Sequence, residues 1–189
     1  MEKSNAPLRF NTRAEWREWL QENHCRTNEV WFIFPLRSSG EKAISYNDAV
    51  EEALCFGWID STVRSLDENY KIQRFSPRNP KSKYSQANKE RLKRLADKGL
   101  IHETIAENVS LVLSEEFVFP TDILEAVRSD EAAWEHFQKF SEPYKRIRIA
   151  YIEAARKRPD EFRKRLNNFI DKTRERKLIP GYGGIDKYY

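Results

Sequence analysis

The chain has 189 residues, 34% of them charged and 13% aromatic, and carries a formal net charge of +4. This length suits one domain, or one domain with a small appended subdomain, that buries a core without disulfide bonds. The aromatic content excludes a disordered chain.

Cysteine usage and hydropathy indicate the expected compartment. Cys25 and Cys55 lie far apart and lack the spacing of a disulfide scaffold or a metal site, so we expect reduced thiols, no metal and no cofactor. The amino terminus lacks the apolar core of a signal peptide, and no run of about 18 apolar residues occurs. We therefore expect a cytoplasmic protein with no membrane span.

Helix and strand signals alternate through the first 75 residues. Polar capping residues start two helices, and Gly57 ends the second of them. Runs of β-branched and aromatic residues predict strands. The predicted elements are a helix from residue 11 or 12 to about 24, a strand at 30–34, a helix from 45 to 57, and a hairpin of strands at 58–63 and 70–75.

The remainder of the chain predicts helices only. Pro77 and Pro80 exclude regular structure between them, and Ser85 caps the next helix, which Gly99 ends. Further helices are predicted at 104–113, 121–127, 131–140, 143–157 and 160–177. We expect the glycine-rich tail at 179–189 to be an extended arm or a frayed end.

These elements predict an α+β fold. A small antiparallel sheet packs with helices in residues 1–114, and residues 115–189 form a helical subdomain with an extended tail.

The first candidate binding segment is GWIDS at 57–61. Because side chains alternate along a strand, Trp58 and Asp60 share one face, where a ring can stack on a planar group and a carboxylate can accept its hydrogens. The structural alternative is that Trp58 belongs to the core and Asp60 accepts a hydrogen bond from Arg74 or a turn.

A second candidate lies in RFSPR at 74–78. Arg74 and Arg78 could form a guanidinium clamp for phosphate or carboxylate, with the hydroxyl of Ser76 as a further donor. In the structural alternative, one of the two arginines pairs with Asp60 and pins the loop to the sheet.

The helix start that follows would complete an anion pocket. Tyr84 supplies a ring, and the first turn after Ser85, which includes Asn88, offers backbone N–H groups and the positive end of the helix dipole. The predicted ligand-binding set is Trp58, Asp60, Arg74, Ser76, Arg78, Tyr84, Ser85 and Asn88.

Other reactive side chains do not form a motif. Cys55 lies near a helix carboxyl end, which would raise the thiol pKa, so we expect core packing for it. Glu51 and Glu52 are adjacent on a helix and point in different directions, unlike an acid/base pair. The three histidines lack metal-ligand spacing.

Three motifs resemble the YdeI/OmpD-associated family, described as bacteriocin-protection proteins. They are ALCFGWIDS at 53–61, RFSPR at 74–78 and YSQANK at 84–89. The resemblance extends through most of the chain, including the opening helix and residues 120–127 and 145–165. It implies a bacterial cytoplasmic protein with a role in stress or antimicrobial-peptide protection, and it implies no particular reaction.

Our first functional hypothesis is therefore a protection-type protein that binds a small anionic or aromatic ligand, or an anionic segment of a partner. A second hypothesis is nucleic-acid binding. The segment from Lys71 to Lys98 contains ten basic residues and only two acidic ones, and further basic runs occur at 145–148 and 163–165. A hydrolase with Asp60 as base ranks third, so we lean against an enzyme.

Overall fold

The computed structural model describes residues 6–189, and the chain separates into two compact units. One unit holds the residues through Lys83 together with Arg91–Leu113. The other holds Tyr84–Glu90 together with Ser114–Tyr189.

This division differs from the expected one at Tyr84–Glu90, which includes the first turn of helix α3 (Gln86–Asp97). Ala87 packs against a buried cluster around Ile147, and Lys89 forms an ion pair of 2.5 Å with Glu115. Both contacts are with residues of the helical unit, so this turn clusters there.

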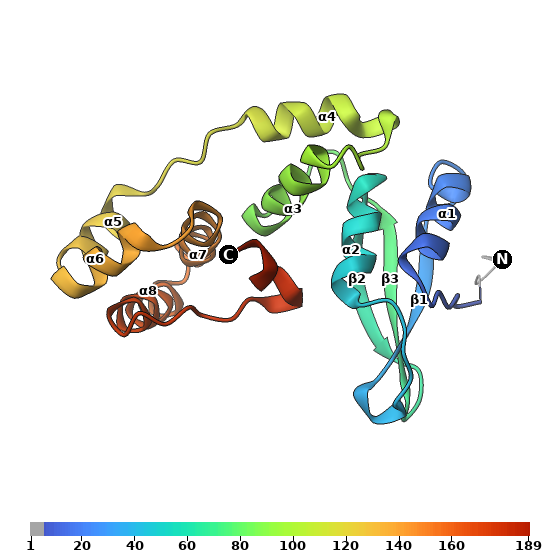
Figure 1. Ribbon diagram of the computed structural model, residues 1–189, viewed down its shortest axis with the longest axis horizontal. Coiled ribbons are helices and arrows are strands. Elements are labelled where there is room, and N and C mark those ends of the chain that lie inside the picture. Colours follow the sequence, from blue (N-terminus) through green and yellow to red (C-terminus); the bar gives the residue numbers. More distant parts are fainter. Residues whose placement is uncertain (1–5) are drawn as a thin grey trace. The chain divides into compact units, whose positions relative to one another are not determined.

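The first unit is built on a three-stranded antiparallel sheet with strand order β1-β3-β2. Its strands are β1 (Val30–Pro35), β2 (Trp58–Ser65) and β3 (Tyr70–Pro77). Helices α1 (Arg13–Asn23) and α2 (Tyr46–Cys55) cover one face of this sheet (Figure 1). The predicted α+β class, with its small antiparallel sheet, is confirmed.

Alternation along the strands builds the core under these helices. Every second residue of β1 is buried, and the Phe32 ring lies 5.3 Å from the fully buried indole of Trp16 on α1. The same indole contacts Phe75 of β3 at 5.5 Å and donates a hydrogen bond of 3.0 Å to the Ala49 carbonyl of α2. A single side chain of α1 therefore contacts the sheet and α2 together.

The predicted helix caps are present. The hydroxyls of Thr12 and Ser45 accept hydrogen bonds from backbone N–H groups in the first turns of α1 and α2. Gly57 ends α2 with a φ of +72°. A Cβ added at Gly57 would lie 3.0 Å from the Ile105 side chain, so both the backbone conformation and the space favour glycine.

The second unit contains no strand among its described residues, as expected. Helix α4 (Glu103–Ser114) belongs to the first unit through Leu113. The second unit contains α5 (Thr121–Arg128), α6 (Glu131–Lys139), α7 (Glu142–Glu153), α8 (Pro159–Arg174) and the 3-10 helix η2 (Tyr182–Tyr188). The core of this unit consists of Ile123, Val127, Ala133, Phe137, Tyr144, Ile149, Ile152 and Phe169.

The expectation of an extended or frayed tail is wrong. Residues 182–188 form a 3-10 helix, and Ile185 and Tyr188 are buried against Ile147 of α7. Glycine content predicted flexibility, but the apolar side chains beside the glycines bury enough surface to fix the segment.

Within residues 6–189, none of the helices combines the length and the apolar composition that a bilayer crossing requires.

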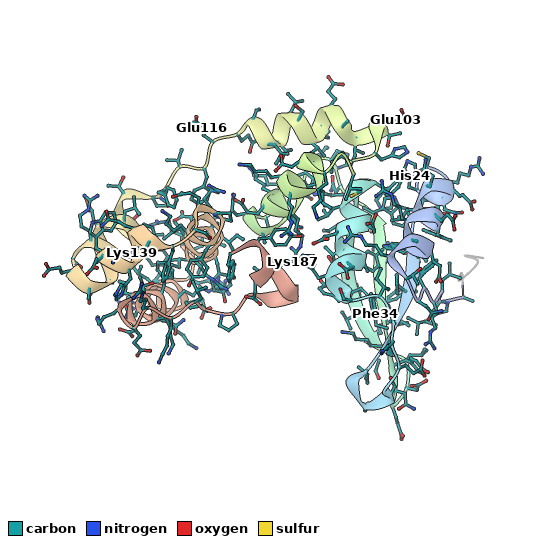
Figure 2. All side chains as sticks on the ribbon, viewed as in Figure 1. His24, Phe34, Glu103, Glu116, Lys139 and Lys187 are labelled. Carbon is teal, nitrogen blue, oxygen red and sulfur yellow. The ribbon has the colours of Figure 1, made fainter. Side chains whose placement is uncertain are left out.

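Two histidines that are distant in sequence meet where α1 ends and α4 begins. Figure 2 labels the first of them, His24, and Glu103, the first residue of α4. The rings of His24 and His102 lie 4.8 Å apart, and Nδ1 of His102 accepts the Thr104 backbone N–H at 3.3 Å. The Gln21 amide nitrogen lies 3.1 Å from Nε2 of the same ring, so donors face both ring nitrogens and at least one of these nitrogens must be unprotonated. A neutral ring can accept the Thr104 N–H and cap the start of α4, which a doubly protonated ring cannot do.

We predict that this cap makes the first unit less stable in acid. Burial, aided by the charges of His24 and Arg17 and opposed by Glu103, lowers the pKa of His102 below its ordinary value of 6.5. The unfolded chain therefore takes up a proton near pH 6.5 before the folded unit does. Stability is complete above that pH and is lost as the pH falls toward the lower, folded-state pKa.

Urea unfolding followed by tryptophan fluorescence measures this effect, because Trp16, Trp19, Trp31 and Trp58 all lie in the first unit. The His102→Asn variant keeps a capping acceptor without a titrating ring, so its stability should fall less between pH 7.5 and pH 5.5. Equal pH dependence in the wild type and the variant would contradict the role of His102.

Candidate functional site

The sheet separates two of the predicted binding elements. Trp58 is 1% exposed, and its indole N–H donates to the His24 carbonyl at 3.2 Å, so this ring is a core side chain. Asp60 pairs across the sheet with the buried Phe75 and shares the helix-covered face. Arg74, which neighbours Phe75 on β3, lies on the opposite face.

Asp60 and Arg74 have different partners. The Asp60 carboxylate accepts the Tyr46 hydroxyl at 2.6 Å and the Gln73 amide at 3.4 Å. The Arg74 guanidinium donates to Glu29 at 2.6 Å and to the Ser61 hydroxyl at 3.4 Å. The suggested ion pair between Asp60 and Arg74 is thus replaced by two separate interactions.

The loop after β3 folds back on itself. The Arg78 guanidinium donates to the Ser82 and Asn79 carbonyls, and its backbone N–H donates to the Gly57 carbonyl at 2.9 Å. Ser76 is half-buried on β3, opposite Ile59 of β2. Arg78 therefore shapes the loop that follows the sheet.

The three remaining predicted residues belong to the segment that clusters with the helical unit. Ser85 caps α3 as predicted, because its hydroxyl accepts the Asn88 backbone N–H at 3.3 Å. Tyr84 precedes this cap and is half-buried. The eight predicted residues are therefore divided between the two units.

Two carboxylates that the sequence did not single out as a site are buried on α2. Glu51 and Glu52 are 3% and 2% exposed, and both accept hydrogen bonds from Arg13 of α1. Glu52 also accepts from Arg17 at 2.7 Å, while Glu51 accepts from the Asn47 amide at 2.9 Å. Arginines four residues apart on α1 match this acidic pair, so the network joins two helices.

Cys55 packs in the core beside this network, as expected. The thiol is fully buried, and burial together with the charge of Glu52 raises its pKa to about 12. A thiol in this state stays protonated at neutral pH and is a poor nucleophile.

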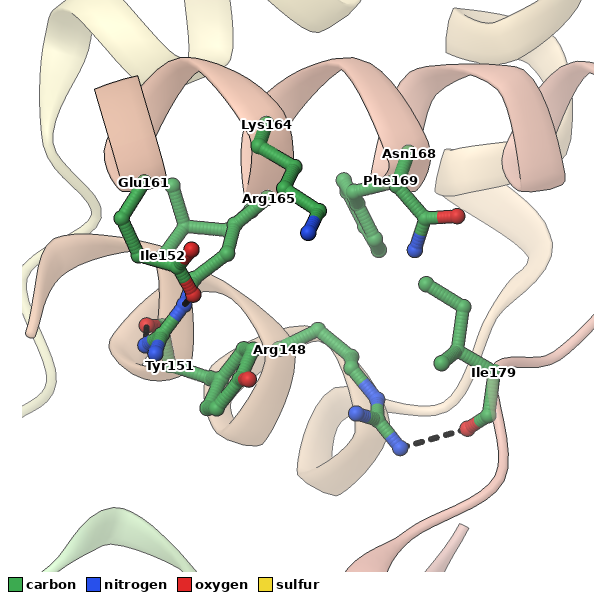
Figure 3. A pocket seen from close by; sticks show the side chains of 9 residues that line it. All are labelled: Arg148, Tyr151, Ile152, Glu161, Lys164, Arg165, Asn168, Phe169 and Ile179. Carbon is green, nitrogen blue, oxygen red and sulfur yellow. Dashed lines mark hydrogen bonds and ion pairs between the residues drawn. The ribbon is translucent and has the colours of Figure 1, made fainter. Parts of the chain in front are cut away.

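A pocket of about 230 Å³ opens between α7 and α8 in the helical unit (Figure 3). Its cationic and polar side chains come from both helices, and its apolar wall includes a tail residue. The lining residues are Arg148, Tyr151, Ile152, Glu161, Lys164, Arg165, Asn168, Phe169 and Ile179.

Arg148 is the most unusual residue of this pocket. It is only 8% exposed, and its terminal N–H groups donate to the Ile179 carbonyl and the Tyr189 hydroxyl. Its Nε is buried and has no hydrogen-bond partner among the described residues. Both acceptors are neutral, so the guanidinium is buried without an opposing carboxylate among the ion pairs of the described residues.

The other charged residues of the pocket differ in whether they form an ion pair. Arg165 pairs with Glu161 at 2.7 Å and lies 3.7 Å from the centre of the Tyr151 ring. This guanidinium, with smaller contributions from the charges of Lys164 and Arg158, holds the pKa of the Glu161 carboxyl below its ordinary value. Lys164 forms no ion pair within the described part of the chain.

The basic runs at 145–148 and 163–165 were offered from the sequence as part of a possible nucleic-acid surface. Arg148 does not fit such a surface, because it is buried together with its neighbours Ile147 and Ile149. A usable signal was present: Lys164 and Asn168 are four residues apart, which places them on one face of α8.

Comparison with known proteins divides the chain in two. Residues 8–108 match a family described as a domain of unknown function (DUF8412). Residues 116–176 match a family described as Bacteriocin-protection, YdeI or OmpD-Associated. No curated protein and no solved structure matches the chain.

The family named from the sequence is matched over residues 116–176, which include the expected stretches at 120–127 and 145–165 but none of the three motifs. The motifs that carried the resemblance, at 53–61, 74–78 and 84–89, fall within the first match. The second match contains the pocket residues from Arg148 to Phe169. The chain thus belongs to the DUF8412 family, whose model covers residues 8–108, and its residues 116–176 are similar to the bacteriocin-protection, YdeI or OmpD-associated family.

Proposed function

We propose that the helical unit is a binding module that holds a small organic anion in the pocket between α7 and α8. The match to the bacteriocin-protection, YdeI or OmpD-associated family supports a protection-type function at the level of the family. A ligand pocket whose lining residues, except Ile179, fall in the matched segment offers a way for such a protein to act without catalysing a reaction.

The buried guanidinium of Arg148 carries this proposal. A cation removed from water is stabilised fully only by an opposing charge and by partners for all of its donors. Arg148 has two neutral acceptors and one buried N–H that lacks a partner in the part of the chain that the structure describes. An anion in the pocket would supply both the missing charge and the missing acceptor.

The rest of the pocket fits an anion with an organic body. Lys164 and Asn168 project from α8 toward the side of the pocket that carries Arg148 (Figure 3). Apolar surface from Ile152 and Phe169 lies beside these donors. Ligand sites commonly combine apolar walls with a few such polar groups.

Pairing of the other basic residues favours this pocket over an extended nucleic-acid surface. Salt bridges within the protein already neutralise most arginines of α7, α8 and the turn between them, which leaves less charge for a phosphate backbone. The pairs are Arg146 with Glu90, Arg156 with Asp122 and Glu153, Arg163 with Asp160, and Arg174 with Asp130 and Asp171.

We predict that benzoate binds more tightly than benzamide, its neutral analogue, in isothermal titration calorimetry. Losing a charged hydrogen-bond partner costs about 1.5–3 kcal/mol, so Arg148→Gln should weaken benzoate binding about tenfold or more. Lys164→Met tests the same pocket at a side chain outside the core. Lys157→Met, which removes an exposed lysine outside the pocket, should bind like the wild type.

Circular dichroism of each variant would show whether the helices are intact. Equal affinity for benzoate and benzamide, or unchanged benzoate affinity in both pocket variants, would contradict the proposal.

We also predict that benzoate stabilises the helical unit. A ligand at a hundred times its dissociation constant adds about 2.7 kcal/mol to the unfolding free energy when it binds only the folded state. Urea unfolding followed by the helical circular dichroism signal should show this gain in the wild type and not in Arg148→Gln. A gain of equal size in both proteins would place the benzoate elsewhere.

A further inference from the structure

The charge balance of the α7–α8 pocket restricts the class of anion that it fits. Three cations line it, and one of them, Arg165, is matched by Glu161. Arg148 and Lys164 remain without a carboxylate partner among the ion pairs of the described residues. A ligand with a single negative charge would leave one of these two cations unmatched.

The donors also differ in kind and direction. Arg148 offers one N–H from a fixed plane, Lys164 offers a rotatable ammonium group, and Asn168 offers an amide. Three donors from two helices are better matched by three terminal oxygens arranged tetrahedrally than by the two coplanar oxygens of a carboxylate.

We infer that the pocket recognises the phosphate monoester of a small apolar group. The doubly charged phosphate accepts from Arg148, Lys164 and Asn168, while the organic group lies against Ile152 and Phe169. This inference rests on the proposed function, since it names the ligand class of the same pocket.

The size of the pocket limits the organic group. Its volume of about 230 Å³ is below the range of roughly 300–1,000 Å³ that is usual for drug-sized ligands. A ring or a short chain fits this space, whereas a nucleotide or a whole lipid would extend beyond it. A lipid could still present its phosphate head to the same donors.

The inference is tested by comparing phenyl phosphate with phenyl sulfate by calorimetry at pH 7.5. The two compounds have nearly the same shape, but the phosphate carries almost two charges and the sulfate carries one. We expect phenyl phosphate to bind about tenfold more tightly or better, as one additional charge-assisted contact allows. Lys164→Met should abolish this preference, and Lys157→Met should retain it.

A pH series gives an independent readout. The second pKa of a phosphate monoester is about 6, so the dianion fraction falls about fourfold between pH 7.5 and pH 5.5. Phenyl phosphate affinity should fall by about the same factor, while phenyl sulfate affinity should stay constant. Circular dichroism at both pH values confirms that the helices are intact.

Vesicles distinguish a soluble ligand from a lipid headgroup. The full chain is sedimented with phosphatidylcholine vesicles, with and without phosphatidic acid, whose head is a phosphate monoester. Co-sedimentation that requires phosphatidic acid and is lost in Lys164→Met indicates that the phosphate monoester belongs to a lipid. Tight binding of phenyl phosphate without co-sedimentation indicates that it belongs to a soluble molecule.

The failures are separable. If phenyl sulfate or benzoate binds as tightly as phenyl phosphate and still depends on Arg148, the phosphate class is overturned and the anion pocket stands. If none of these anions binds, the proposed function falls together with the inference.

Discussion

A guanidinium that is buried without a matching carboxylate among the described residues links α7 to the tail of the helical unit. Arg148 lies in the apolar stripe of α7, so the residues around it exclude water. The rings of Tyr144 and Tyr189 approach it at 5.6 and 5.3 Å, and its terminal nitrogen donates to two acceptors near the chain end. These contacts stabilise the cation in part and hold the tail against α7.

In the first unit, by contrast, the buried carboxylates have partners of opposite charge. Its buried carboxylates, Glu51 and Glu52, are matched by Arg13 and Arg17, and the oxygens of Glu52 both accept from an arginine. A closed network of this kind fixes the packing of α1 on α2 and leaves little for a ligand to complete. The acidic pair of the first unit has arginine partners, whereas Arg148 lacks a carboxylate partner among the described residues. The helical unit is therefore the better candidate for binding an anion.

Local signals predicted the architecture well. Thr12 and Ser45 cap the helices they were expected to cap, and strand alternation correctly placed Trp58 and Asp60 on one face. Alternation alone does not tell which face the helices cover. Trp58 is therefore a core side chain, and Arg74 lies on the other side of the sheet.

The pocket was harder to predict, because it depends on which basic residue the fold buries. Several arginines occur at similar intervals along the sequences of α7 and α8. Only packing against Ile179 and Tyr189 distinguishes Arg148 from the others. Those partners come from a glycine-rich tail whose composition predicted disorder. The burial of that tail and the burial of Arg148 are thus two parts of one tertiary contact.

The Nε–H proton of Arg148 offers the most direct test of whether this guanidinium binds an anion. Its resonance in a proton–nitrogen correlation spectrum can be assigned by its absence in Arg148→Lys. Titration with phenyl phosphate should move this resonance along a saturable curve, with the same dissociation constant as calorimetry gives. A resonance that stays in place while the anion binds would show that Arg148 does not hold the ligand.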